Sequence, residues 1–313
     1  MSEPAANSAA LESPRRLWAR FLEGVGSRSR FEVAAGLTIL LTLFFPFDAW
    51  YFQITAQLLA IVFVLHPRAA ASPLFWYLLA LLGSFAIIEH WQPVDNHKYL
   101  LVYWLWGLVA AAFFSRDDDR DLILRRTARF MICFIMLGAV VQKTISGSYL
   151  DATMFEVILL TDPRFEGLLA VLGIDRHDLA LSQALYNDLR APVPVIAGGE
   201  AIMPADERLK AMAVAFTWLD YVIQAVVGVL FLLPGERMER FAHLSLVVFI
   251  LFIYFIAPVL GFGWLIAILG IALAHGRFPR LTLGYLASFI VLISYQIPWS
   301  KVAMELGWLE VMQ

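Results

Sequence analysis

The stretch from Phe130 to Tyr149 reads FMICFIMLGAVVQKTISGSY, twelve apolar residues that lead directly into Gln142 and Lys143. Its composition is typical of the chain. Of 313 residues, 61% are hydrophobic and 16% are charged, and the mean hydropathy is +0.74. These values lie outside the usual range of soluble domains, so the sequence predicts a protein of the lipid bilayer.

The apolar stretches approach the roughly 20 residues that a helix needs to cross about 30 Å of hydrocarbon. A transmembrane β-barrel would show alternating segments of about ten residues, whereas 33–45 and 241–257 are apolar on all faces. We therefore predict an all-α polytopic membrane protein with about nine transmembrane helices. The predicted spans are 31–47, 50–66, 73–90, 98–115, 127–146, 210–233, 240–258, 261–275 and 281–298.

The positions of Lys and Arg indicate how these spans are oriented. Fifteen of the 23 Lys and Arg residues fall in the N-terminal tail or in the even-numbered connections. Basic residues in short loops tend to stay in the cytoplasm. We expect a multi-pass protein of the bacterial cytoplasmic (inner) membrane, with its N-terminus inside and its C-terminus outside.

The chain divides into five parts around these spans. We predict a cytoplasmic N-terminal tail at 1–30, transmembrane helices 1–5 at 31–149, an external cap at 150–208, transmembrane helices 6–9 at 209–300 and a C-terminal tail at 301–313. The tail lacks the apolar core of a signal peptide. The cap combines segments of helical spacing with the Pro and Gly of 191–204, which predicts short helices joined by an irregular turn. Its small size indicates that any chemistry resides in the membrane helices.

Several classes of site have no support in the sequence. Cys133 is the single cysteine, which excludes an intrachain disulfide and a cysteine metal site, and the six histidines show no ligand spacing. There is no GxGxxG, no phosphate loop and no nucleophile elbow, and we expect no nucleic-acid partner. The DDDR run at 117–120 is interpreted as a solvated cytoplasmic loop.

Lys143 is the first candidate site residue. It follows Arg129 by fourteen residues, or roughly 21 Å along a helix, which places it below the external surface. There it either snorkels to the interface as an anchor or faces a polar cavity. Both interpretations remain open on the pattern alone.

A second group of polar residues lies between the third and fourth predicted spans, in EHWQPVDNHKYL at 89–100. Asp95 or Asn96 would cap the following helix, and His97 would then be an ordinary first-turn residue. Alternatively, His97 acts as an acid/base or hydrogen-bonding group, since its ordinary pKa is near 6.5.

Asp220 and Gln224 form the third candidate pair. They are four residues apart in AFTWLDYVIQAVVGVLF (215–231) and share one helix face. A carboxyl group at this depth is costly unless it is paired or lines a cavity. The pair is therefore either a structural contact between helices or part of a site.

Two segments are the basis of a resemblance to a known family: DNHKYLLVYWL (95–105) and GAVVQKTISGSYL (138–150). Together they resemble the membrane region of the vitamin K-dependent gamma-carboxylase superfamily and its bacterial relatives, the horizontally transferred transmembrane (HTTM) domain proteins. Asn96 and His97 match the family's Asn-His pair, and Lys143 matches its catalytic lysine. The resemblance implies that Lys143 deprotonates a reduced quinone, which then reacts with oxygen to give a strong base and finally an epoxide. It also implies that His97 assists catalysis.

These residues lead to a functional hypothesis. We expect Lys143 and His97 to be catalytic, and Asn96, Gln142, Asp220 and Gln224 to bind a reduced quinone. The carboxylases of the family have a large lumenal region after the membrane domain, whereas this chain stops at Gln313. We therefore expect oxidation or carbon-acid chemistry on a small or lipid-like substrate rather than protein carboxylation, or a partner protein that supplies a substrate domain.

Two other functions remain open. A transporter or channel would use Asp220, Gln224 and Lys143 to line its pathway. A non-catalytic membrane subunit would instead dock a partner protein through residues 150–208.

Overall fold

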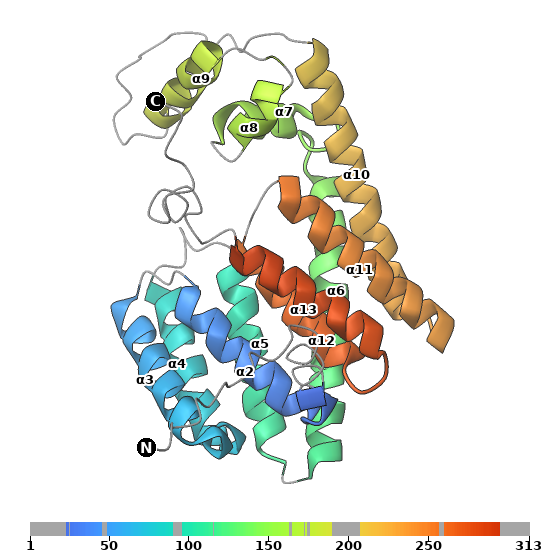
Figure 1. Cartoon of the computed structure of the whole chain (residues 1–313). Coiled ribbons are helices and arrows are strands. Elements are labelled where there is room, and N and C mark those ends of the chain that lie inside the picture. Colours follow the sequence, from blue (N-terminus) through green and yellow to red (C-terminus); the bar gives the residue numbers. More distant parts are fainter. Residues whose placement is uncertain are drawn as a thin grey trace, which may run out of the picture.

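The computed structural model describes residues 23–24, 26–45, 49–89, 96–114, 116–162, 165–171, 173, 176–189, 207–256 and 260–294. All regular secondary structure within these ranges is helical, which confirms the predicted all-α class for that part of the chain (Figure 1). The elements are α2 (Arg30–Phe44), α3 (Trp50–Leu65), the 3₁₀ helix η1 (Pro67–Ala71), α4 (Pro73–Glu89), α5 (Asn96–Ala112), α6 (Asp117–Ile145), α7 (Thr153–Thr161), α8 (Glu166–Val171), α9 (Arg176–Leu189), α10 (Glu207–Leu232), α11 (Glu236–Ile256), α12 (Leu260–Ala274) and α13 (Pro279–Ser294).

The ranges predicted as spans fall on α2 to α6 and α10 to α13. Two of these helices, α6 over Asp118–Ile145 and α10, are long and apolar enough to cross a membrane by length and composition. Helices α3, α4, α12 and α13 are apolar but shorter, with 10–17 residues in their apolar parts. Among the described helices, length and composition therefore support two membrane spans and do not support the nine that were predicted.

Helix α6 begins earlier than predicted. The DDDR run at 117–120 was expected to be a loop, but it forms the first turn of this 29-residue helix. Acidic side chains stabilise a helix N-terminus through the helix dipole, and the Leu and Arg residues that follow are strong helix formers. This interpretation of the run as a loop was therefore wrong.

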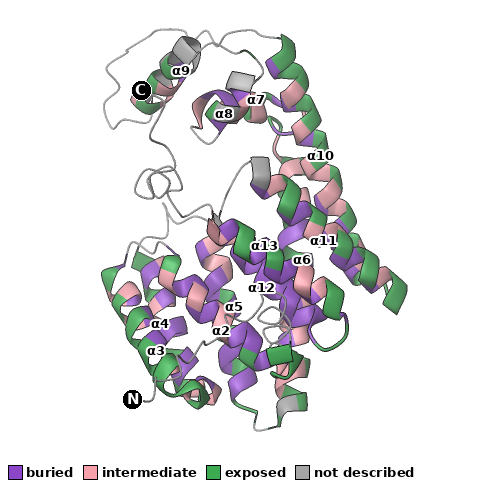
Figure 2. Cartoon of the chain, in the orientation of Figure 1, coloured by how far each residue is buried: buried purple, intermediate pink, exposed green. Residues whose placement is uncertain are grey.

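Helix α12 lies at the centre of the bundle and is buried from Trp264 to Ala274 (Figure 2). It packs against α2, α6, α11 and α13. Glycines allow this close packing: a Cβ on Gly270 would collide with the ring of Tyr285, and a Cβ on Gly263 would lie 2.8 Å from Leu292 Cδ1. Small residues at helix contacts are typical of membrane bundles.

The outward faces of the bundle are apolar as well. Trp50 and Val64 on α3 are 72% and 75% exposed, and Phe130 on α6 is 69% exposed. Large exposed apolar side chains on α10 include Val214, Trp218, Leu219, Val222, Val226 and Val229. Contiguous apolar surface of this extent is rare on proteins that face water.

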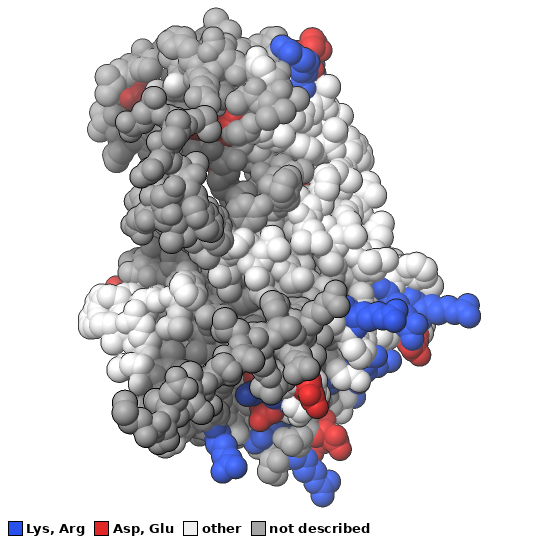
Figure 3. All heavy atoms as spheres, viewed as in Figure 1, with Lys and Arg blue, Asp and Glu red and all other residues white. Residues whose placement is uncertain are grey.

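Charged side chains concentrate at one end of the bundle. In Figure 3, the Lys and Arg side chains gather mainly at the lower end, whereas the described surface along the middle of the molecule carries none. The lower end contains the connections α5–α6, α10–α11 and α12–α13 (Figure 1). On the face shown, the described surface therefore has a middle without Lys or Arg and a lower, basic end where most of these side chains lie.

Helices α7, α8 and α9 lie away from the bundle, beside the first turns of α10 (Figure 1). They occupy part of the range 150–208 that was expected to form a cap. A separate apolar cluster holds this part together, made of Ala152, Leu159, Leu160, Phe165, Leu169, Leu209 and Ala213. Residues 1–22, 190–206 and 295–313, which include most of the predicted tails and the Pro/Gly turn, lie outside the described residues.

Candidate functional site

Helices α6 and α10 place Lys143 beside Asp220 and Gln224. The two helices pack closely where Gly228 meets Leu137, since a Cβ on Gly228 would lie 2.6 Å from Leu137 Cδ2. Lys143 lies in the last turn of α6. The i, i+4 spacing on α10 presents Asp220 and Gln224 to the same neighbour, as the sequence predicted.

A hydrogen-bond network joins these three side chains. Lys143 Nζ donates to Asp220 Oδ2 and, at 2.8 Å, to Gln224 Oε1. Gln224 Nε2 donates to Asp220 Oδ1 at 2.9 Å. The amide orientation follows from the charges, because its oxygen faces the ammonium and its nitrogen faces the carboxylate. The side chains of Lys143 and Asp220 are 14% and 13% exposed, so the ion pair is largely shielded.

Tyr149 completes this network, which we call the Lys143 cluster (Lys143, Tyr149, Asp220 and Gln224). Its hydroxyl donates to Asp220 Oδ2 at 2.6 Å, and its ring centroid lies 4.7 Å from Lys143 Nζ. Burial, reinforced by the Asp220 carboxylate, raises the pKa of the Tyr149 phenol above its ordinary value. The phenol therefore stays protonated and keeps donating to Asp220 at neutral pH.

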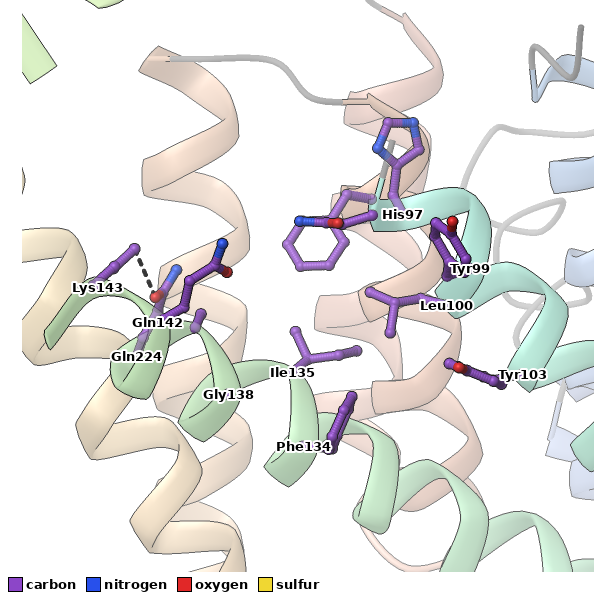
Figure 4. A pocket seen from close by; sticks show the side chains of 13 residues that line it. His97, Tyr99, Leu100, Tyr103, Phe134, Ile135, Gly138, Gln142, Lys143 and Gln224 are labelled. Carbon is purple, nitrogen blue, oxygen red and sulfur yellow. Dashed lines mark hydrogen bonds between the residues drawn. The ribbon is translucent and has the colours of Figure 1, made fainter. Parts of the chain in front are cut away.

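The Lys143 cluster borders a pocket of about 530 Å³, which we call the α5–α6 pocket. Figure 4 shows His97 on α5 across the pocket from Lys143 and Gln142 on α6. Tyr99, Leu100, Tyr103, Phe134 and Ile135 supply an apolar lining below the polar groups. Tyr103 and Phe134 are 56% and 57% exposed, so these pocket walls also reach the outward face of the bundle.

Five of the six predicted site residues line this pocket: Asn96, His97, Gln142, Lys143 and Gln224. The sixth, Asp220, contacts the pocket indirectly through its bonds to Lys143 and Gln224. Asn96 is the first residue of α5, and the His97 ring lies edge-on to Phe45 with 5.3 Å between ring centroids. Residues from three helices, far apart in the sequence, thus lie together.

Tyr149 and the aromatic wall of the pocket, formed by Tyr103 and Phe134, were not predicted from the sequence. Tyr149 lies three residues beyond the end of the predicted span 127–146. Its position six residues after Lys143 was the available signal, since a chain that turns back after a helix can bring such a residue onto the last turn. Tyr103 and Phe134 resembled ordinary apolar span residues.

The chemistry available here is proton exchange next to an apolar cavity. Lys143 has three N–H donors, and Asp220 and Gln224 engage two of them. Lys143 also lines the pocket, so its ammonium group borders any molecule that binds there. Because the carboxylate and the ammonium interact strongly, the pair titrates as one unit rather than as two independent groups.

A second polar network lies at the basic end of the bundle. Glu239 on α11, whose side chain is 7% exposed, accepts from Arg129 on α6 at 2.8 Å and from Arg277 at 2.6 Å. We call these three residues the Glu239 cluster. Nearby, His243 Nδ1 lies 2.9 Å from the Tyr285 hydroxyl inside the bundle. None of these residues lines the α5–α6 pocket.

No family model matches the chain, and neither a curated protein nor a solved structure matches it.

Proposed function

We propose that the chain is a multi-pass protein of a cytoplasmic membrane, with the nine predicted helices embedded in the bilayer and the N-terminus inside. The apolar outward faces, the buried apolar α12 and the basic end support this arrangement. Helices of 15–17 residues span about 22–26 Å, and local thinning of the bilayer accommodates such lengths at modest cost. The range 150–208 then lies on the external side.

We propose further that the α5–α6 pocket binds a reduced quinone that enters from the bilayer. The single observation that carries this proposal is the composition of the pocket: one polar end formed around Lys143, and an aromatic and aliphatic remainder that reaches the outward face. An apolar molecule with oxygen atoms at one end complements such a lining. The volume of about 530 Å³ lies in the range of small-molecule sites.

In this proposal, the paired side chains handle protons. Lys143 would pass one proton to the Asp220 carboxylate as it takes a proton from a hydroxyl of the ligand, so that the pair gains one proton in total and Lys143 stays charged. Tyr149 and Gln224 hold the carboxylate in place through their hydrogen bonds. His97 exchanges a proton on the opposite side of the pocket, and Asn96 and Gln142 donate hydrogen bonds to oxygen atoms of the ligand.

When bound, the quinol would be oxidised and molecular oxygen reduced, as the resemblance stated above implies. Together with the resemblance to the gamma-carboxylase superfamily, this favours oxidation or carbon-acid chemistry on a small or lipid-like substrate. A partner protein that supplies a substrate domain would dock at the external side, where α7 to α9 lie.

The test is to purify the protein in native lipid discs, extract the bound lipids and identify them by mass spectrometry. Wild type is compared with Lys143→Met, His97→Ala and the charge-neutral double variant Lys143→Met/Asp220→Leu. Lys210→Ala and His66→Ala are matched controls, because Lys210 and His66 are exposed and lie outside the pocket. The double variant distinguishes loss of ligand from misfolding, since it leaves no unpaired carboxylate.

The expected result is a quinone that is retained by wild type and by both controls and lost from the pocket variants. If no sample contains a quinone, or if the pocket variants retain as much as the controls do, the quinol proposal is rejected. Substrate flux into sealed vesicles that Lys143→Met abolishes, in the absence of any bound quinone, would identify a transporter instead.

A further inference from the structure

A second cavity, of about 560 Å³, lies at the basic end where the start of α2, the end of α3, η1 and the first turn of α6 meet. We call it the α2–η1 cavity. Its polar lining includes Arg28, Arg68 and Arg120 together with Ser27 and Ser29. Phe31, Phe63, Ala35 and Ala70 form its apolar part. None of its lining residues lines the α5–α6 pocket.

The charge of this cavity is unbalanced. Glu32 is its one acidic lining residue, and the start of α2 engages it: Ser29 N donates to Glu32 Oε2 at 2.9 Å in a capping box. Within the described part of the chain, the guanidinium groups of Arg28 and Arg68 have no hydrogen bond or ion pair. Because Glu32 is engaged, the guanidinium groups of Arg28 and Arg68 leave a positive site, and the N-terminus of α2 adds a further positive potential.

Other contacts hold the backbone of Arg28 and the side chain of Arg120 in place. His275 Nε2 lies 2.9 Å from the carbonyl oxygen of Arg28, which links the chain before α2 to the segment after α12. Arg120 Nε donates to the Phe114 carbonyl at 2.5 Å, and its guanidinium stacks over Phe31 at 5.5 Å. A ligand that binds here therefore meets groups that are already partly ordered, which lowers the entropic cost of binding.

The lining beside the arginines indicates an amphipathic ligand. The apolar lining of the cavity lies between α2 and α3, where the Phe63 ring packs against α2 at Gly36. Arginine forks match phosphate oxygens, and apolar side chains next to them match an acyl chain. A free phosphate would use only the first of these two features.

We propose that the α2–η1 cavity binds the phosphate group of an anionic phospholipid, with the start of an acyl chain against its apolar lining. Recognition of the phosphate follows from the arginines and serines alone. The lipid as its source depends on the membrane position proposed above, but not on any quinone chemistry. The site would hold the basic end of the bundle at the inner leaflet, whose anionic lipids attract such clusters.

The experiment is native mass spectrometry of the full-length protein, titrated in detergent with phosphatidylglycerol and with phosphatidylcholine of the same acyl chains. The test variant is Arg28→Gln/Arg68→Gln, and the control is Arg237→Gln/Arg280→Gln. The control removes two exposed arginines at the same end that do not line the cavity. Each basic residue near an anionic lipid changes binding by roughly fivefold, so the test variant is expected to lose about 25-fold in affinity for phosphatidylglycerol.

A parallel titration with inorganic phosphate distinguishes the two sources of the anion. If phosphate displaces phosphatidylglycerol only weakly, the lipid is the ligand. If phosphate binds as tightly as the lipid, the cavity is a phosphate site with a soluble ligand. Equal loss of phosphatidylglycerol in the test and control variants, or no loss in either, overturns the proposal. Thermal unfolding of each variant, expected to be unchanged, excludes misfolding as the cause of a loss.

Discussion

The Lys143 cluster and the Glu239 cluster are built from similar parts but differ in two respects. Each pairs a shielded carboxylate on one helix with a cation on α6. The first uses lysine and borders a pocket, whereas the second uses two arginines and contributes nothing to that pocket. Lysine can give up its proton in a protein interior, and arginine stays charged. The comparison suggests a site for proton exchange in one place and a permanent ionic link between helices in the other.

The largest effect is expected when the two clusters are made alike by Lys143→Arg. Arginine keeps the charge and the pairing with Asp220 but cannot act as a base, so quinol-dependent oxygen consumption should fall about 10²- to 10⁴-fold. The converse substitution Arg129→Lys should leave oxygen consumption within about twofold of wild type, because Glu239 still has a cation on each side. Full activity in Lys143→Arg would mean that Lys143 serves only as a fixed charge.

Removal of the carboxylate from the second cluster should affect stability rather than activity. Glu239→Gln leaves Arg129 and Arg277 without a counter-charge, and we expect this to lower the free energy of unfolding by about 2 kcal/mol. The loss is smaller than for a fully buried pair because the side chains of both arginines are 35–40% exposed. Thermal unfolding in detergent measures this cost. Glu236→Gln is the control, since its pair with Arg240 is 58–63% exposed and should contribute less than about 1 kcal/mol.

An unchanged unfolding temperature for Glu239→Gln would contradict the structural role of the Glu239 cluster. A loss of bound ligand in this variant, without any loss of stability, would instead show that the two clusters are coupled.

The smallest effect is expected for Tyr149→Phe, which removes one hydrogen bond from Asp220 and keeps the ring beside Lys143. A hydrogen bond to a charged group contributes roughly 1.5 kcal/mol, so ligand affinity should fall by about tenfold. Because burial raises the pKa of Tyr149, the wild-type phenol stays protonated between pH 6 and 9, and the ratio of the two affinities should be constant over this range. Ligand titrations at several pH values test this, and a ratio that changes near neutral pH would contradict it.

The residues of the α5–α6 pocket were predictable where a single helix carries the signal. The i, i+4 spacing identified Asp220 and Gln224 as one face of a helix, and the position of Lys143 near the end of an apolar stretch singled it out as a candidate. Tyr149 was missed because its contact with Asp220 depends on how the chain turns after α6, which periodicity does not describe. The aromatic wall was missed because Tyr103 and Phe134 satisfy the pattern of a span equally well whether they face lipid or a cavity.

The Glu239 cluster escaped prediction for a different reason. Arg129 and Glu239 are separated by 110 residues. Arg129 lies near the start of the predicted span 127–146 and Glu239 lies in the first turn of α11, positions where charged residues usually face water. Only the packing of α6 against the neighbouring helices brings the two together. The DDDR run illustrates the same limit locally, since its charges suggested a loop but also suit a helix N-terminus.

Helix α10 carries Leu209 and Ala213 in the apolar cluster of the 150–208 region, and Asp220 only seven residues, or roughly 10 Å, further along the same axis. The apolar cluster and Asp220 are therefore joined by one continuous helix. A tilt of the first turns of α10 moves the Asp220 carboxylate relative to Lys143, and a molecule that fixes the ion pair in turn restrains the tilt of α10. By thermodynamic reciprocity, binding of a ligand in the pocket would then change the affinity of any partner whose binding to α7–α9 depends on that tilt.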